Sequence, residues 1–149
     1  MRAGAPAADK VLLDTGLLVA LHRSDDRWHS AAVQWLRSFD GGLVTVEAVL
    51  TEAAFFLPPR QRAALAGMAA MGLIEVRAPD SDGWRRIAAL TEKYADIDPD
   101  LADIGLIWLA ESSGLRRIVT VDDADFSIYR IHGRTRFERV PWRSGMTGK

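Results

Sequence analysis

The sequence predicts an α/β protein with the architecture of a three-layer α/β/α sandwich around a mostly parallel central sheet. Short apolar runs alternate along the chain with longer segments of helical periodicity. Glycine, proline and aspartate residues separate these segments where turns and helix ends are expected. The 149 residues, 48% of them hydrophobic, suffice for one core but leave no room for two domains. Strands that alternate with helices of roughly 10 to 15 residues form parallel sheets covered on both faces.

In the first half of the chain, three strands and four helices are predicted. The apolar run before Asp14 is a strand, and the Thr-Gly pair after it turns into a short helix. An aspartate cap at Asp25 or Asp26 begins the next helix, which Gly41-Gly42 end. Pro58-Pro59 separate the two helices that follow the second strand. The expected strands are 10–14, 43–46 and 73–76, and the expected helices are 17–21, from the aspartate cap to 39, 47–57 and 60–71.

The second half predicts two longer helices, a strand, a short helix and a last strand. Trp84 and Ile87 lie on one helical stripe. Asp98-Pro-Asp100 is a helix-start signal, and Gly114 lies beyond the end of the same helix. A β-branched run then predicts a strand that ends before Asp122. The expected helices are 80–94, 98–111 and 122–129, and the expected strands are 117–121 and 136–140.

One domain is expected over residues 10–143, between a disordered leader at 1–9 and a short tail at 144–149. The start of the chain has no apolar stretch typical of a signal peptide, and no run of about 18 apolar residues occurs. The sequence contains no cysteine, which excludes disulfide frameworks and zinc sites built on thiolates. We therefore expect a cytoplasmic protein that does not span a membrane.

The charge is balanced overall but not along the chain. There are 19 basic and 20 acidic residues, so the net charge is -1. Residues 126–149 hold six basic residues and one acid, Glu138, which gives +5 for this segment and -6 for the rest. This asymmetry predicts an anion-facing surface near the C-terminus, opposed to an acidic region elsewhere.

Several acids stand where a solvated residue is not expected, and each has two interpretations. Asp14 and Asp122 end predicted strands, where ligands of parallel sheets bind, but both also suit the N-cap of the next helix. Glu52 has apolar neighbours at helical spacing, so it either needs a partner or lies at the solvated edge of the stripe. Asp103 lies near the inward face of its helix, or else serves in its first turn with Asp100 as the cap.

Convergence of these acids at one end of the sheet would require a cation, because like charges at close range repel. Lys10, Lys93 and Lys149 are the only lysines, and the histidines are scattered. An oxygen-rich site for Mg²⁺ or Mn²⁺ is the expected solution. Asp125, in the turn after Asp122, is interpreted as a structural first-turn acid.

Four segments occur in an order and spacing that is specific only in combination. They are Leu12-Leu-Asp-Thr-Gly16, residues 45–52, Asp100-Leu-Ala-Asp103 with Gly114, and Ile118-Val-Thr-Val-Asp122. Together they resemble, nearly end to end, a PIN-domain ribonuclease of the kind found as the VapC toxin in VapBC toxin–antitoxin pairs. Leu17 and Ile104-Gly105 depart mildly from the family pattern, and a glycine inside a helix weakens it locally.

The resemblance implies a PIN-like fold and an endoribonuclease that hydrolyses RNA phosphodiester bonds with water activated by Mg²⁺ or Mn²⁺. Asp14 and Asp103 would bind the metal directly, and Glu52 and Asp122 would bind a second ion or orient the water. Thr120 and Asp100 would support them, and RNA would contact Arg130, Arg134 and Arg136. A small VapB-like antitoxin that inserts a basic side chain among the acids, and a homodimer, are implied as well. The alternative is a non-catalytic RNA-binding or assembly module with a PIN-like fold, in which the acids are helix caps.

Overall fold

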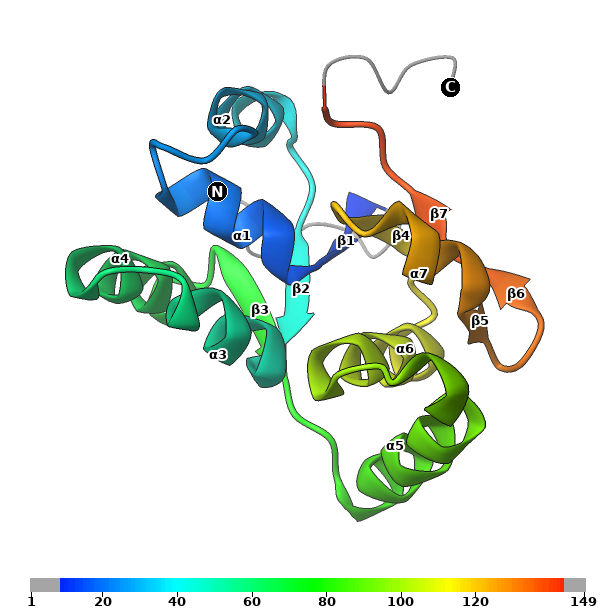
Figure 1. Ribbon diagram of the computed structural model, residues 1–149. Coiled ribbons are helices and arrows are strands. Elements are labelled where there is room, and N and C mark those ends of the chain that lie inside the picture. Colours follow the sequence, from blue (N-terminus) through cyan, green and yellow to red (C-terminus); the bar gives the residue numbers. More distant parts are fainter. Residues whose placement is uncertain (1–8, 144–149) are drawn as a thin grey trace.

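A computed structural model of the protein, which describes residues 9–143, confirms the predicted fold class (Figure 1). Five parallel strands form the central sheet in the order β3-β2-β1-β4-β7. The middle strand is β1, in which Leu12 pairs with Val44 on one side and with Ile118 on the other. The strands are β1 (Val11–Leu13), β2 (Leu43–Val46), β3 (Ile74–Arg77), β4 (Arg117–Val119) and β7 (Glu138–Arg139).

Helices occupy the segments between the strands. They are α1 (Thr15–His22), α2 (His29–Ser38), α3 (Glu47–Phe55), α4 (Pro59–Ala70), α5 (Ser81–Lys93), the 3₁₀ turn η2 (Ala95–Ile97), α6 (Leu101–Ser113) and α7 (Asp123–Ile128). The helices α1 and α4 lie on one side of the sheet, and α5 and α6 lie on the other (Figure 1). Helix α3 contacts both α1 and α6. Within residues 9–143, no helix has the length and apolar character needed to cross a bilayer.

The core is centred on β1 and α6. All three residues of β1 are buried, as are most residues of α6. Gly105 permits the close packing of α6 on the sheet, because a Cβ at this position would lie 3.0 Å from Val46 Cγ2 in β2. The local cost of a helical glycine is therefore offset by helix–sheet packing.

The last predicted strand, 136–140, is wrong in detail. The chain forms an antiparallel hairpin of β5 (Arg130–Ile131) and β6 (Thr135–Arg136), and only β7 joins the main sheet. His132 and Gly133 adopt left-handed backbone conformations (φ 52° and 76°), which closes the turn between the two strands. Strands of two residues are too short to give an alternating pattern, so the hairpin has no periodic signal in the sequence.

The predicted aspartate cap of α2 is also corrected. The helix begins at His29, and Trp28 occupies the cap position without a side-chain hydrogen bond. Asp26 instead accepts the N–H of Trp28 (2.8 Å) and so organises the turn before the helix. Pro59 is the first residue of α4, where its missing N–H has no cost.

Candidate active site

Asp14 follows β1 directly and is held by two hydrogen bonds. Its Oδ1 accepts the N–H of Thr15 (2.8 Å), which makes Asp14 the N-cap of α1. Its Oδ2 accepts the hydroxyl of Thr120 (2.7 Å). The residue is only 5% exposed. The cap interpretation of Asp14 is therefore confirmed, and its second carboxylate oxygen lies in a buried polar environment that is compatible with a ligand site.

Thr120 connects two of the predicted acids. Its hydroxyl, which donates to Asp14, also accepts the N–H of Asp122 (2.8 Å). Thr120 is buried and comes directly after β4, the neighbour of β1 in the sheet. Because the strands are parallel, their carboxyl ends bring both acids to the same edge of the sheet.

Asp103 enters the site from the first turn of α6. It is 7% exposed, and its Oδ2 accepts the hydroxyl of Tyr129 (2.8 Å). Asp100 is the N-cap of this helix and accepts the N–H of Asp103 (2.8 Å). The capping role is thus assigned to Asp100, and the Asp103 carboxylate is left for the site.

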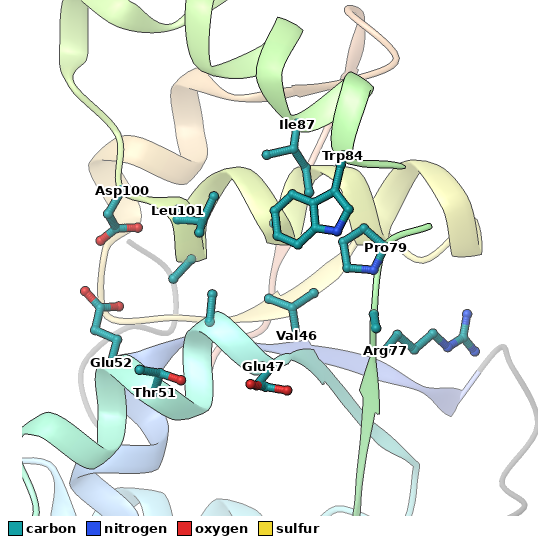
Figure 2. A pocket seen from close by; sticks show the side chains of 14 residues that line it. Val46, Glu47, Thr51, Glu52, Arg77, Pro79, Trp84, Ile87, Asp100 and Leu101 are labelled. Atoms are coloured by element: carbon teal, nitrogen blue, oxygen red, sulfur yellow. The ribbon is translucent and has the colours of Figure 1, made fainter. Parts of the chain in front are cut away.

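Glu52 lies on α3 and is half-buried. Its Oε1 accepts the hydroxyl of Thr15, the residue after Asp14, at 2.5 Å. Figure 2 shows the carboxylates of Glu52 and Asp100 facing each other. Of the two interpretations of Glu52, the one in which its carboxylate has a hydrogen-bond partner is therefore correct. The partner, Thr15, is the first residue of α1.

The start of α7 adds a cluster of acids that could bind a metal ion. Asp122 is the N-cap of this helix and accepts the N–H of Asp125 (3.1 Å). One carboxylate oxygen from each of Asp103, Asp122 and Asp125 lies within 4.8 Å of the other two. Asp125, which the sequence pattern predicts to be structural only, is thus part of the cluster.

All of these acids line one cleft of about 470 Å³. It contains eight carboxylates, those of Asp14, Asp26, Glu52, Asp98, Asp100, Asp103, Asp122 and Asp125. Within residues 9–143, Arg27 is the only basic residue in the lining, and none of the eight acids forms an ion pair. The cleft therefore concentrates negative charge with almost no compensation from the chain itself.

Burial and the neighbouring carboxylates raise the pKa values of three of these acids. Burial raises the pKa of Asp14 to about 6, and the charges of Asp100 and Asp122 add to the effect. Burial, together with the charges of Asp14 and Asp100, raises the pKa of Asp103 to about 8. Burial is also the main cause of the raised pKa of Glu52. At neutral pH the cleft must therefore bind either protons or cations.

The three arginines expected to contact RNA lie outside this lining. The Arg130 guanidinium donates to the carbonyl groups of residues 127, 128 and 129 and so caps the end of α7. Arg134 and Arg136 are exposed in the β5–β6 hairpin. Their contact with RNA stays a prediction.

A second, mostly apolar groove of about 520 Å³ adjoins the cleft (Figure 2). Trp84, Ile87 and Leu101 line it, and Trp84 and Leu101 are half-exposed. Glu52 and Asp100 line both the groove and the acidic cleft. The two cavities are therefore continuous at these carboxylates.

The sequence matches the PIN domain family over residues 11–131. The chain belongs to the PIN domain family. This confirms the assignment made from the four acid-bearing segments, and the matched residues include all four predicted catalytic acids of this PIN domain. No curated protein sequence matches the chain.

The fold of this PIN domain is similar to a crystal structure of Mycobacterium tuberculosis VapC20, described as a sarcin-ricin loop cleaving toxin. The two structures superpose with a TM-score of 0.67 at 18% sequence identity. The match covers 72% of this chain and 86% of VapC20. At this identity the likeness supports the fold, which agrees with the parallel sheet described above.

The cleft of the PIN domain brings together all four predicted catalytic acids and both supporting residues, Thr120 and Asp100. Four further participants were not predicted as site residues: Asp125, Thr15, Tyr129 and Arg27. A hydroxyl or an exposed arginine has no distinctive spacing, so the sequence alone gives no signal for these contacts. The crowding of three acids within residues 122–125 is the one signal that could have identified Asp125.

Replacing Thr120 with valine is expected to destabilise the PIN domain by about 2 kcal/mol. The substitution preserves shape but removes the donor to buried Asp14 and the acceptor of the Asp122 N–H. Urea unfolding at pH 7 measures the loss, and Thr120→Ser, which retains the hydroxyl, is the matched control. Equal stability of the valine variant and the wild type would show that the bridge contributes nothing.

Proposed function

We propose that this PIN-domain protein is a metal-dependent endoribonuclease that hydrolyses phosphodiester bonds of RNA. The observation that carries the proposal is the cluster of Asp103, Asp122 and Asp125 in a cleft whose eight carboxylates have no ion-pair partner within residues 9–143. Such an arrangement is costly for a protein that has no cation to place there. Membership of the PIN domain family supports the same conclusion.

The donor set fits a hard divalent cation, because all the candidate ligands are carboxylate oxygens. We assign Mg²⁺ or Mn²⁺ to the cleft, held by Asp14 and Asp103, with Glu52 and Asp122 at a second ion or at the attacking water. Asp125 joins this set because its carboxylate lies beside those of Asp103 and Asp122. A bound divalent ion would stabilise charge on the phosphoryl oxygens and lower the pKa of a water molecule.

The remaining side chains orient and tune these carboxylates. The Thr120 hydroxyl and the Thr15 N–H fix the two oxygens of Asp14. The Tyr129 hydroxyl fixes one oxygen of Asp103 and leaves the other free of hydrogen bonds within residues 9–143. Burial raises the pKa of Glu52, and its carboxylate is held by the Thr15 hydroxyl beside Asp14, which suits a group that orients a water molecule.

We further propose that the protein is the toxin of a type II toxin–antitoxin pair. The similarity of the fold to the VapC20 toxin supports this assignment. A small VapB-like antitoxin would then place a basic side chain among the acids, where it would compensate the charge in place of the metal. A homodimer and a cytoplasmic location, where an RNA-cleaving toxin meets its substrate, complete the proposal.

The non-catalytic alternative is disfavoured by Asp103. A capping acid would hydrogen-bond the N–H groups of its own helix, but the Asp103 carboxylate bonds to Tyr129 and faces other carboxylates. A single hydrogen bond to Tyr129 does not require a negative charge, and the position of Asp103 beside other carboxylates adds repulsion, which indicates a role in binding a cation.

Metal dependence tests the proposal directly. Purified protein freed of metal with a chelator is expected to leave RNA intact, and Mg²⁺ or Mn²⁺ is expected to restore cleavage. The same ions should raise the melting temperature, because they bind the folded cleft and not the unfolded chain. Mapping of 5′ ends in cellular RNA after induction identifies the cleavage sites. Cleavage that persists in the chelator would reject the metal-dependent mechanism.

A further inference from the structure

Arg27 is the one cation of the acidic cleft within residues 9–143. It lies in the loop between α1 and α2, and its side chain is exposed. Its guanidinium carbon lies 4.6 Å from the centre of the Trp28 ring, a cation–π contact. No ion pair within the described residues involves Arg27, although acids surround it.

The platform beneath Arg27 is connected to the acids by a chain of contacts. The Trp28 ring packs edge-on against Trp142, with 6.4 Å between ring centres. The indole N–H of Trp142 donates to the Thr120 carbonyl (3.0 Å), and the Thr120 hydroxyl holds Asp14. The Trp28 ring, over which the Arg27 guanidinium lies, is therefore held in place relative to the candidate metal site.

A second guanidinium lies near the same ring but has a different role. Arg143 lies 5.0 Å from the Trp28 ring centre, and its side chain is 11% exposed. It pairs with Asp123 at 2.6 Å, so its charge is already compensated. Arg143 is thus a structural support of the rim, in contrast to exposed Arg27.

We propose that Arg27 binds a phosphate of the RNA strand next to the scissile one. This inference rests on the proposed function and names the contact that holds the substrate. An RNA backbone that enters a cleft of eight carboxylates is repelled unless each phosphate near them meets a cation. A divalent ion would compensate the charge of the scissile phosphate. The Arg27 guanidinium, which lies over the Trp28 indole, presents paired N–H donors in one plane to the neighbouring phosphate.

The test compares Arg27→Ala and Arg27→Lys with Arg85→Ala, which removes an exposed arginine that lies on α5 outside the cleft lining. The probe is a labelled RNA stem-loop with single-stranded flanks, studied with Mg²⁺ at several NaCl concentrations. Arg27→Ala is expected to raise KM by about tenfold at low salt while kcat stays within about threefold. The dependence of log kcat/KM on log salt should become shallower by about 0.7, the loss of one phosphate contact. Arg27→Lys should retain part of the affinity and the original slope.

A second readout separates substrate binding from effects on the acids. The melting-temperature rise produced by Mn²⁺ should be the same in Arg27→Ala as in the wild type.

If KM and the salt slope of Arg27→Ala match those of Arg85→Ala while the wild type cleaves, the inference is wrong and the proposed function stands. If the Mn²⁺ response or kcat collapses instead, Arg27 acts on the metal site and not on RNA. A wild type that neither binds nor cleaves RNA overturns both proposals.

Discussion

Replacing Asp14 with asparagine is expected to lower the rate of RNA cleavage by about a thousandfold, which corresponds to about 4 kcal/mol of transition-state stabilisation. Asparagine retains an oxygen for the Thr15 N–H and is itself a good helix cap, so the fold should survive. What is lost is a buried negative charge at the carboxyl end of β1, beside Asp103 and Asp122. Carboxylate charge is what a hard divalent cation requires from its ligands.

The measurement uses purified protein with Mg²⁺ or Mn²⁺, together with mapping of 5′ ends in cells that express each variant. Asp82→Asn removes an exposed acid on α5 outside the cleft and serves as the matched control. The rise in melting temperature on addition of metal should shrink in Asp14→Asn and persist in Asp82→Asn. Cleavage by Asp14→Asn at the wild-type rate would reject the assigned metal site.

Replacing Asp103 with asparagine is expected to stabilise the metal-free protein at pH 8 by on the order of 5 kcal/mol. The folded-state pKa of Asp103 is raised from its ordinary value of 3.8 to about 8, mainly by burial. Between these values the folded protein holds a proton that the unfolded chain releases, so the stability of the wild type falls as pH rises from about 4 to 8. Asparagine can still accept the Tyr129 hydroxyl but has no charge to bury.

Thermal unfolding in the presence of a chelator at pH 5, 6, 7 and 8 measures this effect. The wild type should lose melting temperature steadily across the series, whereas Asp103→Asn should lose much less, the remainder being due to the raised pKa values of Asp14 and Glu52. Metal ions should stabilise the wild type most at pH 8, where they compete least with protons. A wild type whose stability in the chelator does not change between pH 5 and 8 would contradict the assigned environment of Asp103.

The sequence predicts four of the five strands of the main sheet and the acids at its edge, because these follow from patterns of apolar residues and from the positions where strands end. An acid that follows a parallel strand, such as Asp14, lies at the carboxyl-end edge of the sheet, where the acids that follow neighbouring strands also lie. Glu52 was identified by its apolar neighbours at helical spacing, and the structure supplies its partner, Thr15.

The contacts that complete the site had no such pattern. Asp125 resembles any first-turn acid of a helix, and only the tertiary structure brings its carboxylate close to that of Asp103 on α6. Arg27 lies in a turn without periodicity, and its importance comes from the acids that other segments place around it. The β5–β6 hairpin is likewise too short to leave a pattern.

The contact between Trp142 and Thr120 has a consequence for synthesis of the protein on the ribosome. Asp14 is among the first residues of the domain to be translated, yet its orientation depends on Thr120, which in turn is held from position 142. These pairings join residues from both ends of the described domain, so the entropy of closing such long loops makes them late contacts in folding. A partly synthesised domain therefore has an incomplete acidic cleft, and Asp14 is held in its final orientation only after residue 142 has been added and has packed on Thr120.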